Sequence, residues 1–265
     1  MAINFNPGLT AGSINTLNSV QRSSETNYLQ LSTGQRINSA ADDAAGLSIA
    51  TRIDATTRSL QMAFRNANDG ISMLQVADGA LSQSTDILSR MRELTLQSAN
   101  GTYSERDRQA IDKEYEQLAS ELNRTLENTS FNGNEVFGDA PFSLQVAADA
   151  GETLEFKLNA PSPSLSGSSS ESIEDRLAKI DDALTQVQDT QADIGAVSNR
   201  LVYASDNLNN TIQQARESYS RLLDTDYAVA SAEKARIDLQ KQVSIAILAQ
   251  ANSSSEAVLQ LLGNS

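Results

Sequence analysis

Apolar residues recur every three or four positions along two long stretches of the chain, and this spacing predicts two paired helices. The first stretch starts at Ile53 and ends near Asn100, and the second runs from Ile173 to Leu222. The second keeps one heptad register throughout, which predicts a single rod of about 75 Å at about 1.5 Å per residue. The seam residues are Ile53, Leu60, Phe64, Ala67, Ile71, Leu74, Leu81 and Leu88 in the first stretch, and Ile173, Leu177, Ile180, Leu184, Val187, Ile194, Leu201, Leu208, Ile212, Ala215, Tyr219 and Leu222 in the second. Since each seam must be buried against another helix, we expect the two to form a coiled coil with each other.

Polar residues mark the ends of these helices and interrupt their seams. Asp42 or Asp43 can cap the start of the first helix. Ser104 followed by Asp107 resembles a capping box, which predicts a further helix from about Ser104 to Asn128. That helix carries apolar residues on one face: Ile111, Tyr115, Leu118, Leu122 and Leu126. The long seams are interrupted at Asp78 and Thr85 in the first helix and at Gln191, Ser198 and Ser205 in the second.

The middle of the chain, at about residues 130–160, changes to a period of two, which predicts a small β-hairpin. Apolar residues alternate at Phe142, Leu144 and Val146 and again at Leu154, Phe156 and Leu158. The turn sequence Asp149-Ala150-Gly151 lies between the two runs. Phe131-Asn132-Gly133-Asn134 is a further turn signal. Residues 160–170 are rich in Pro, Ser and Gly, and we expect a linker there.

The two ends of the chain carry apolar residues that a single partner helix cannot cover. Near the N-terminus a thin apolar stripe is formed by Ile14, Leu17, Tyr28 and Leu31. Near the C-terminus the chain is apolar on nearly every side, at Val243, Ile245, Ala246, Ile247, Leu248 and Ala249. A helix of this kind needs neighbours all around it. Gln242 and Gln250 bracket the segment too closely for a bilayer span, so we expect self-assembly and no membrane insertion.

Composition excludes most enzyme classes and several kinds of partner. The 265 residues include no Cys and no His, which excludes disulfides, thiolate nucleophiles, His bases and His/Cys metal sites. The net charge of −14, from 20 Lys and Arg against 34 Asp and Glu, argues against binding to nucleic acid. The first charged residue is Arg22 and long apolar runs are lacking, so we expect neither a cleaved signal peptide nor a membrane span. We expect no cofactor.

Two short motifs match those of serine β-lactamases but do not support an enzyme. Ser231-Ala-Glu-Lys234 has the S-x-x-K spacing, and Ser205-Asp206-Asn207 matches S-D-N. A Lys-Thr-Gly motif is missing, and Ser205 occupies a seam position of the long helix, where no pocket can form around it. We therefore expect a non-enzymatic protein.

Several long motifs resemble those of bacterial flagellin. Residues 31–50 (LSTGQRINSAADDAAGLSIA) resemble the N-terminal signature of that family. Similar matches follow at residues 66–81 (NANDGISMLQVADGAL), at residues 91–100 (MRELTLQSAN) and at Phe131-Asn132-Gly133. Residues 247–262 (ILAQANSSSEAVLQLL) are flagellin-like too, so the resemblance covers nearly the whole chain.

The resemblance implies a mainly α fold: a long antiparallel coiled-coil helical bundle formed by both chain ends, with a small β-hairpin in the middle. It implies an inner core domain built from residues 1–42 and 223–265. It also implies an outer core domain at residues 43–222, which would hold the long helices and the hairpin. Most flagellins insert variable outer domains where this chain has only residues 160–170, so a minimal flagellin is expected.

The resemblance further implies a structural subunit that polymerises into the extracellular flagellar filament for swimming motility, exported by the flagellar type III apparatus without a cleaved leader. Residues expected to pack in the filament core are Ile14, Leu17, Tyr28, Leu31, Leu239, Val243, Ile245, Ala246, Ile247, Leu248, Val258, Leu259, Leu261 and Leu262. The implied partners are further copies of the chain, an export chaperone that grips the C-terminal helix, and the filament cap and hook-junction proteins.

A patch near the end of the first long helix has two interpretations. By residue type alone it is a solvated face with a few ion pairs. In flagellins that this chain resembles, a vertebrate Toll-like receptor recognises positions matching Arg90, Leu94, Gln97 and Glu114, and all four carry the recognised residue type. The resemblance therefore implies recognition by that receptor.

Two other functions remain open from the sequence. A hook–filament junction protein of the same superfamily would share the chain ends but would stop growth at one layer. A soluble coiled-coil adaptor would have a stable apolar seam and no disordered ends. Polymerisation of the chain distinguishes the first, and limited proteolysis of its ends distinguishes the second.

Overall fold

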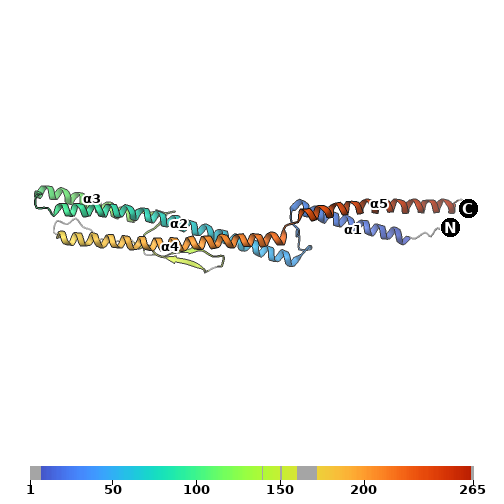
Figure 1. The fold of residues 1–265 in the computed structure, drawn as a ribbon, viewed down its shortest axis with the longest axis horizontal. Helices are drawn as coiled ribbons and strands as arrows, with labels where there is room; N and C mark the ends of the chain where they lie inside the picture. The colour runs from blue at the N-terminus through green and yellow to red at the C-terminus, as the bar shows by residue number, and fades with distance from the viewer. Residues whose placement is uncertain (1–6, 139, 150, 160–171, 264–265) are drawn as a thin grey trace. The chain divides into compact units, whose positions relative to one another are not determined.

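The structure, a computed structural model, describes residues 7–138, 140–149, 151–159 and 172–263, with side chains between residues 11 and 253 of these ranges. Its helices are α1 (Pro7–Thr33), α2 (Ala44–Ser98), α3 (Glu105–Asn128), α4 (Ile173–Leu223) and α5 (Tyr227–Gly263) (Figure 1). Its strands form two antiparallel pairs, β1 (Ser130–Phe131) with β2 (Asn134–Glu135) and β3 (Phe142–Gln145) with β4 (Thr153–Phe156). The mainly helical fold with a small hairpin is thus confirmed.

The chain divides into two compact units. Unit 1 comprises Met1–Ala55 and Gln214–Ser265, and unit 2 comprises Thr56–Gln213. The inner and outer core domains expected from the resemblance, with boundaries at residues 42 and 223, stay a prediction.

Unit 2 is organised by the antiparallel pairing of α2 with α4, as the two heptad patterns predict (Figure 1). Seven-residue steps along the two helices in opposite directions give matched layers: Leu60 with Leu208, Ala67 with Leu201, Leu74 with Ile194, Leu81 with Val187, and Leu88 with Ile180. All ten residues are buried, and each layer falls within one apolar cluster. Two of the polar interruptions also meet, since Gln191 Nε2 donates to Asp78 Oδ1 at 3.4 Å. The five matched layers are thus apolar, and a polar pair lies between two of them.

Helix α3 packs into the same apolar core of unit 2 as α2 and α4. Its buried residues are Ile111, Tyr115, Ala119, Leu122 and Leu126. The predicted capping box is present, because the side chain of Ser104 accepts from Asp107 N and the side chain of Asp107 accepts from Ser104 N. The hydrogen bonds from the Ser104 hydroxyl and then from its backbone lower the pKa of Asp107. Arg176 of α4 lies buried over the Tyr115 ring and pairs with Asp112 at 2.7 Å.

The hairpin β3–β4 packs on α2 in the predicted alternation. Phe142 pairs with Phe156 and Leu144 with Leu154, and the two Phe rings stack with centroids 5.7 Å apart. Gly70 of α2 permits this approach, because a Cβ atom there would overlap with Leu144. The predicted turn at residues 131–134 forms a second, very short hairpin, with Asn132 and Gly133 both at positive φ. The predicted linker at residues 160–170 lies outside the described residues.

Unit 1 is built on the antiparallel pair of α1 and α5 (Figure 1). The joint between them is held by backbone hydrogen bonds from Thr225 N to Gly34 O (2.9 Å) and from Arg36 N to Leu223 O (2.6 Å). Asp43 caps the start of α2, accepting from Gly46 N at 2.9 Å. In the parts of the chain that the structure describes, no helix has the length and hydropathy needed to cross a membrane.

Candidate assembly and recognition surfaces

Among the described residues, three of the five buried in the seam between α1 and α5 are small or polar. The buried residues lie at seven-residue intervals: Val20 and Asn27 on α1, and Ala230, Ile237 and Ser244 on α5. Asn27 Nδ2 donates to the carbonyl of Ala230 at 3.1 Å, which sets these two residues opposite each other. Steps of seven in opposite directions then place Val20 opposite Ile237. The pair buries few large apolar side chains, so its own packing stabilises it little.

Outside the buried positions of this seam, α1 and α5 also expose large apolar side chains. They carry nine large apolar side chains that are 47–69% exposed: Ile14, Tyr28, Leu29, Tyr227, Val229, Leu239, Val243, Ile245 and Ile247. We call this set the outer apolar surface. An accumulation of exposed large apolar side chains on one helix pair indicates a candidate interaction surface.

The residues expected in the filament core fall into three groups. Ile14, Tyr28, Leu239, Val243, Ile245, Ala246 and Ile247 are exposed, whereas Leu17, Leu31 and Leu248 are half-buried beside the seam. The side chains of Val258, Leu259, Leu261 and Leu262 lie outside those that the structure describes. The stripe read from the N-terminal sequence therefore lies to one side of the seam, because Val20 and Asn27, which face α5, were not part of it. Leu29, Tyr227 and Val229 belong to the outer apolar surface and were also missed.

The two units differ in charge. Unit 1 has 8 Lys and Arg residues against 10 Asp and Glu residues, and unit 2 has 12 against 24. Many copies of a nearly neutral unit can come together without strong repulsion, whereas an acidic unit favours solvent. This difference fits self-association through unit 1.

The predicted recognition residues lie on α2 and α3. Arg90 contacts Glu114 through two hydrogen bonds, of 2.9 and 3.2 Å, and contacts Glu93 at 3.0 Å. The hydrogen bond with Glu114, and then the one with Glu93, raises the pKa of Arg90. Gln97 Nε2 donates to the Tyr103 hydroxyl at 3.0 Å. Leu94 is buried, so it supports this surface from below and is not itself displayed.

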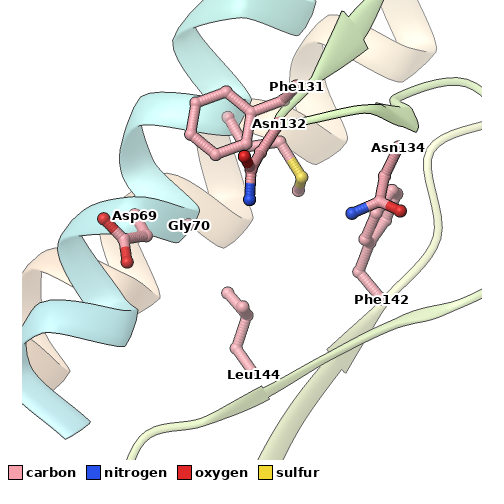
Figure 2. A pocket seen from close by; sticks show the side chains of 8 residues that line it. Asp69, Gly70, Phe131, Asn132, Asn134, Phe142 and Leu144 are labelled. Carbon is pink, nitrogen blue, oxygen red and sulfur yellow. The ribbon is translucent and has the colours of Figure 1, made fainter. Parts of the chain in front are cut away.

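A hollow of about 560 Å³ lies between α2 and the two hairpins. Figure 2 shows Phe131, Phe142 and Leu144 around it, with Asp69 at one side and Asn132 and Asn134 at another. These residues offer apolar walls and amide groups, and Asp69 is the one ionisable group among them. Within the described ranges, His, Cys, Asp and Glu form no cluster that could hold a metal ion. The hollow thus brings together no acid–base pair for catalysis.

The two β-lactamase-like motifs do not build a catalytic group. Ser205 is buried in the seam of α4. Lys234 is exposed on α5 and donates to Asp238 at 2.8 Å. Ser231, one turn before it, is exposed on the same helix. An exposed Ser and Lys on one helix face have no walls that could hold a substrate.

Comparisons with known proteins agree with this architecture. Residues 9–140 match the bacterial flagellin N-terminal helical region, and residues 177–262 match the bacterial flagellin C-terminal helical region. A flagellin from Halalkalibacterium halodurans is 40% identical over 88% of this chain and 89% of its own length. Polar flagellin A from Vibrio parahaemolyticus is 31% identical, with 99% of this chain and 100% of its own length covered.

Solved structures show the same likeness. The crystal structure of Bacillus cereus flagellin is 31% identical with a TM-score of 0.50, covering 54% of this chain and 88% of that chain. A flagellar hook-associated protein from Vibrio parahaemolyticus has a TM-score of 0.61 at 13% identity, covering 69% of this chain and 100% of that chain. The second likeness shows the fold alone.

Proposed function

The chain belongs to the bacterial flagellin family and is a structural subunit of the extracellular flagellar filament, and from this premise we propose how its two ends build that filament. We infer that neighbouring copies of the chain cover the outer apolar surface of α1 and α5. The observation that carries this proposal is the exposure of those nine large apolar side chains on helices whose seam buries only Val20 and Ile237 as larger apolar residues.

The energetics favour assembly over an isolated pair. Ordering two long helices costs conformational entropy at every residue. The buried seam, with Ala230 and Ser244 at two of its layers, offsets little of that cost. Full burial of a Val, Leu, Ile or Phe side chain contributes about 1.5–3 kcal/mol, and the outer apolar surface gains this only among copies. We therefore expect α1 and α5 to be weakly held in the monomer and firmly held in the filament.

The contact between copies is heterologous, because different faces of α1 and α5 meet. Repeating such a contact without ring closure gives a helical filament. The nearly neutral unit 1 suits the inside of the filament, and the acidic unit 2 suits its solvent side. On this basis we propose an inner core domain from residues 1–42 and 223–265 and an outer core domain from residues 43–222.

Polymerisation of charge variants tests the proposal. The variant Val243→Asp with Ile247→Asp places two carboxylates on the outer apolar surface. The matched control, Ala235→Asp with Gln242→Asp, adds the same charges at exposed positions on another face of the same helix. We expect the first variant to raise the critical concentration for filament growth at least about 100-fold, because two apolar contacts are lost at each interface. A pelleting assay measures the critical concentration, and electron microscopy shows whether the pellet contains filaments.

The control should form filaments near the parent concentration. Equal growth of both variants would contradict the proposed role of the outer apolar surface. Equal loss of growth in both would also contradict it, because the effect would then follow charge and not position.

Other partners follow from the same surface. We propose that an export chaperone binds α5 over Val243, Ile245 and Ile247, which are half-exposed and would otherwise drive premature association. The filament cap and hook-junction proteins would meet the same end helices during growth. The chain acts mechanically, without catalysis, in this proposal.

We also propose that the vertebrate Toll-like receptor for flagellin recognises α2 and α3 around Arg90, Gln97 and Glu114, with Leu94 packed beneath. The support is the Arg90–Glu114 pair, which holds two of these side chains in one exposed arrangement on neighbouring helices. Arg is a frequent anchor of protein interfaces because its planar group can stack and form several hydrogen bonds.

A pull-down with the receptor ectodomain tests this recognition. Arg90→Ala should weaken binding about tenfold or more, because an anchoring side chain is lost. Arg92→Ala is the matched control, since Arg92 lies on the same helix and pairs with Asp181 on α4 at 3.1 Å. No binding by the parent chain, or equal binding by both variants, contradicts the proposal.

The hook–filament junction function is not favoured. The two full-length relatives described above are flagellins, and the hook-associated structure is only 13% identical. Purified chain that grows into long filaments, and not into single layers, distinguishes the two functions.

A further inference from the structure

The seam between α1 and α5 contains a buried amide. Asn27 is 5% exposed and follows Val20 by one heptad. Its Nδ2 donates to the carbonyl of Ala230 at 3.1 Å, while its Oδ1 is buried with no hydrogen-bond partner among the described residues. Such a residue makes a helix pair less stable than an apolar residue would. Its presence therefore needs a reason other than stability.

The hydrogen bond depends on the small size of Ala230. Because Ala230 presents only a methyl group, the amide can reach the helix backbone behind it. A slip of the pair by one heptad would place Asn27 opposite Ile237 in one direction and opposite Leu223 in the other. Either side chain would hold the amide away from the backbone, leaving it buried without any hydrogen bond.

We propose that Asn27 determines specificity in self-assembly, selecting the register of α1 and α5 in which it faces Ala230. This inference rests on the proposed packing of these helices among copies in the filament. In that setting many α1 and α5 helices with exposed apolar faces compete for one another. Ser244 is small and Val20 and Ile237 are apolar, so these other seam residues discriminate poorly between registers, and a polar group supplies the discrimination.

The joint within each chain does not replace this role. The hydrogen bonds of Gly34 with Thr225 and of Arg36 with Leu223 align α1 with α5 of the same chain. They have no effect on α1 of one copy meeting α5 of another. The free-energy penalty for burying the Asn27 amide without a hydrogen bond acts both within one chain and between copies.

Disulfide trapping measures the register directly, because the parent chain has no cysteine. In the full chain, Ser24→Cys with Glu233→Cys reports the observed register, since these two half-buried residues flank the seam at opposed positions. Ser24→Cys with Gln240→Cys reports a slip of one heptad. Filaments are grown from each reporter chain, oxidised and analysed by denaturing gel electrophoresis.

With Asn27 present, the first reporter should cross-link and the second should remain mostly reduced. Adding Asn27→Leu should raise cross-linking of the slipped reporter at least about tenfold, because the slipped register no longer buries an unsatisfied amide. Val20→Leu is the matched control: it enlarges an apolar seam residue one heptad away and keeps Asn27. It should leave the slipped reporter at the parent level.

Two results overturn the inference. One is an unchanged slipped fraction in Asn27→Leu, and the other is an equal rise in Val20→Leu, which would point to bulk and not to the amide. Filament growth is scored separately by electron microscopy. Absence of filaments from the parent chain contradicts the proposed packing and with it this inference. If the parent chain forms filaments but Asn27→Leu leaves the cross-linked fraction of the slipped reporter unchanged, the inference alone is contradicted.

Discussion

Two antiparallel helix pairs in this chain share one geometry and differ in what they bury. In both pairs the buried residues lie at seven-residue steps that run in opposite directions along the two helices. The α2–α4 seam places large apolar residues such as Leu74, Leu81 and Ile194 at its layers. The α1–α5 seam places Asn27 and Ala230 at one layer. The same backbone geometry therefore gives one pair that is stable within the chain and one that we expect to depend on other copies.

The outer faces show the complementary difference. Around α1 and α5, nine large apolar side chains are exposed, and the unit is nearly neutral. Unit 2 holds the larger apolar core and most of the excess acidic charge. Large apolar side chains are thus mostly buried in unit 2, whereas in unit 1 many of them are exposed. Substitutions in each helix pair test this difference.

The largest effect is expected in the α2–α4 seam. Leu81→Ala removes a fully buried side chain from a packed layer with Val187. We expect the free energy of unfolding to fall by about 2.7–5 kcal/mol, because a cavity remains where the side chain was. Urea unfolding followed by circular dichroism measures it. Leu96→Ala, at a 52% exposed position of the same helix, is the control, and an equal loss in both would contradict the comparison.

The next effect concerns the buried ion pair of unit 2. Arg176→Ala leaves the carboxylate of Asp112 without its partner in a site where that side chain is only 21% exposed. We expect a loss of about 2–3 kcal/mol in the free energy of unfolding, below the range for fully buried pairs. Arg92→Ala breaks a half-exposed pair with Asp181 and should cost less than about 1 kcal/mol. A larger loss in Arg92→Ala than in Arg176→Ala would show that burial does not determine how much these ion pairs contribute to stability.

A smaller effect is expected at the start of α3. Ser104→Ala removes the capping hydroxyl and should cost about 1 kcal/mol near neutral pH. Because folding lowers the pKa of Asp107 below its ordinary value of 3.8, its contribution is present above that value and is lost as the pH falls through the folded pKa. The difference in unfolding free energy between parent and variant should therefore shrink as the pH is lowered from neutral to below 3.8. A constant difference over this range would refute the link between the cap and Asp107.

The smallest effect on monomer stability is expected on the outer apolar surface. Val243→Ser replaces a 56% exposed side chain, so the free energy of unfolding of the monomer should change by less than about 0.5 kcal/mol. Filament growth should nevertheless become weaker, since the same side chain is buried among copies. Thermal unfolding of the monomer and pelleting of the polymer separate the two. A monomer as strongly destabilised as by Leu81→Ala would show that this surface is internal.

The α2–α4 pair was predictable from the sequence because its seam is made of large apolar residues at a regular spacing. The capping box at Ser104 and the β3–β4 hairpin were predictable for a similar reason, since each depends on residues close in sequence. The short β1–β2 hairpin was found only as a turn, because strands of two residues leave no alternation to detect.

The α1–α5 seam was not predictable by the same rule. Asn27, Ala230 and Ser244 have the character of surface residues, although they are buried. The large apolar residues nearby, such as Tyr28 and Val243, point away from the partner helix. A hydrophobic pattern indicates which side chains are buried in the final structure. In a polymer subunit, part of that burial is provided by neighbouring copies of the chain. The burial of Leu94 was also missed, because the resemblance to recognised flagellins gives residue type and not exposure.

Amide hydrogen exchange, compared between monomer and filament, tests the central claim most directly. The claim predicts that amides of α1 and α5 exchange quickly in the monomer and become strongly protected in the filament. Amides in the α2–α4 seam should be protected in both states. Equal protection of α1 and α5 in monomer and filament would contradict the account, because these helices would then be held by their own chain.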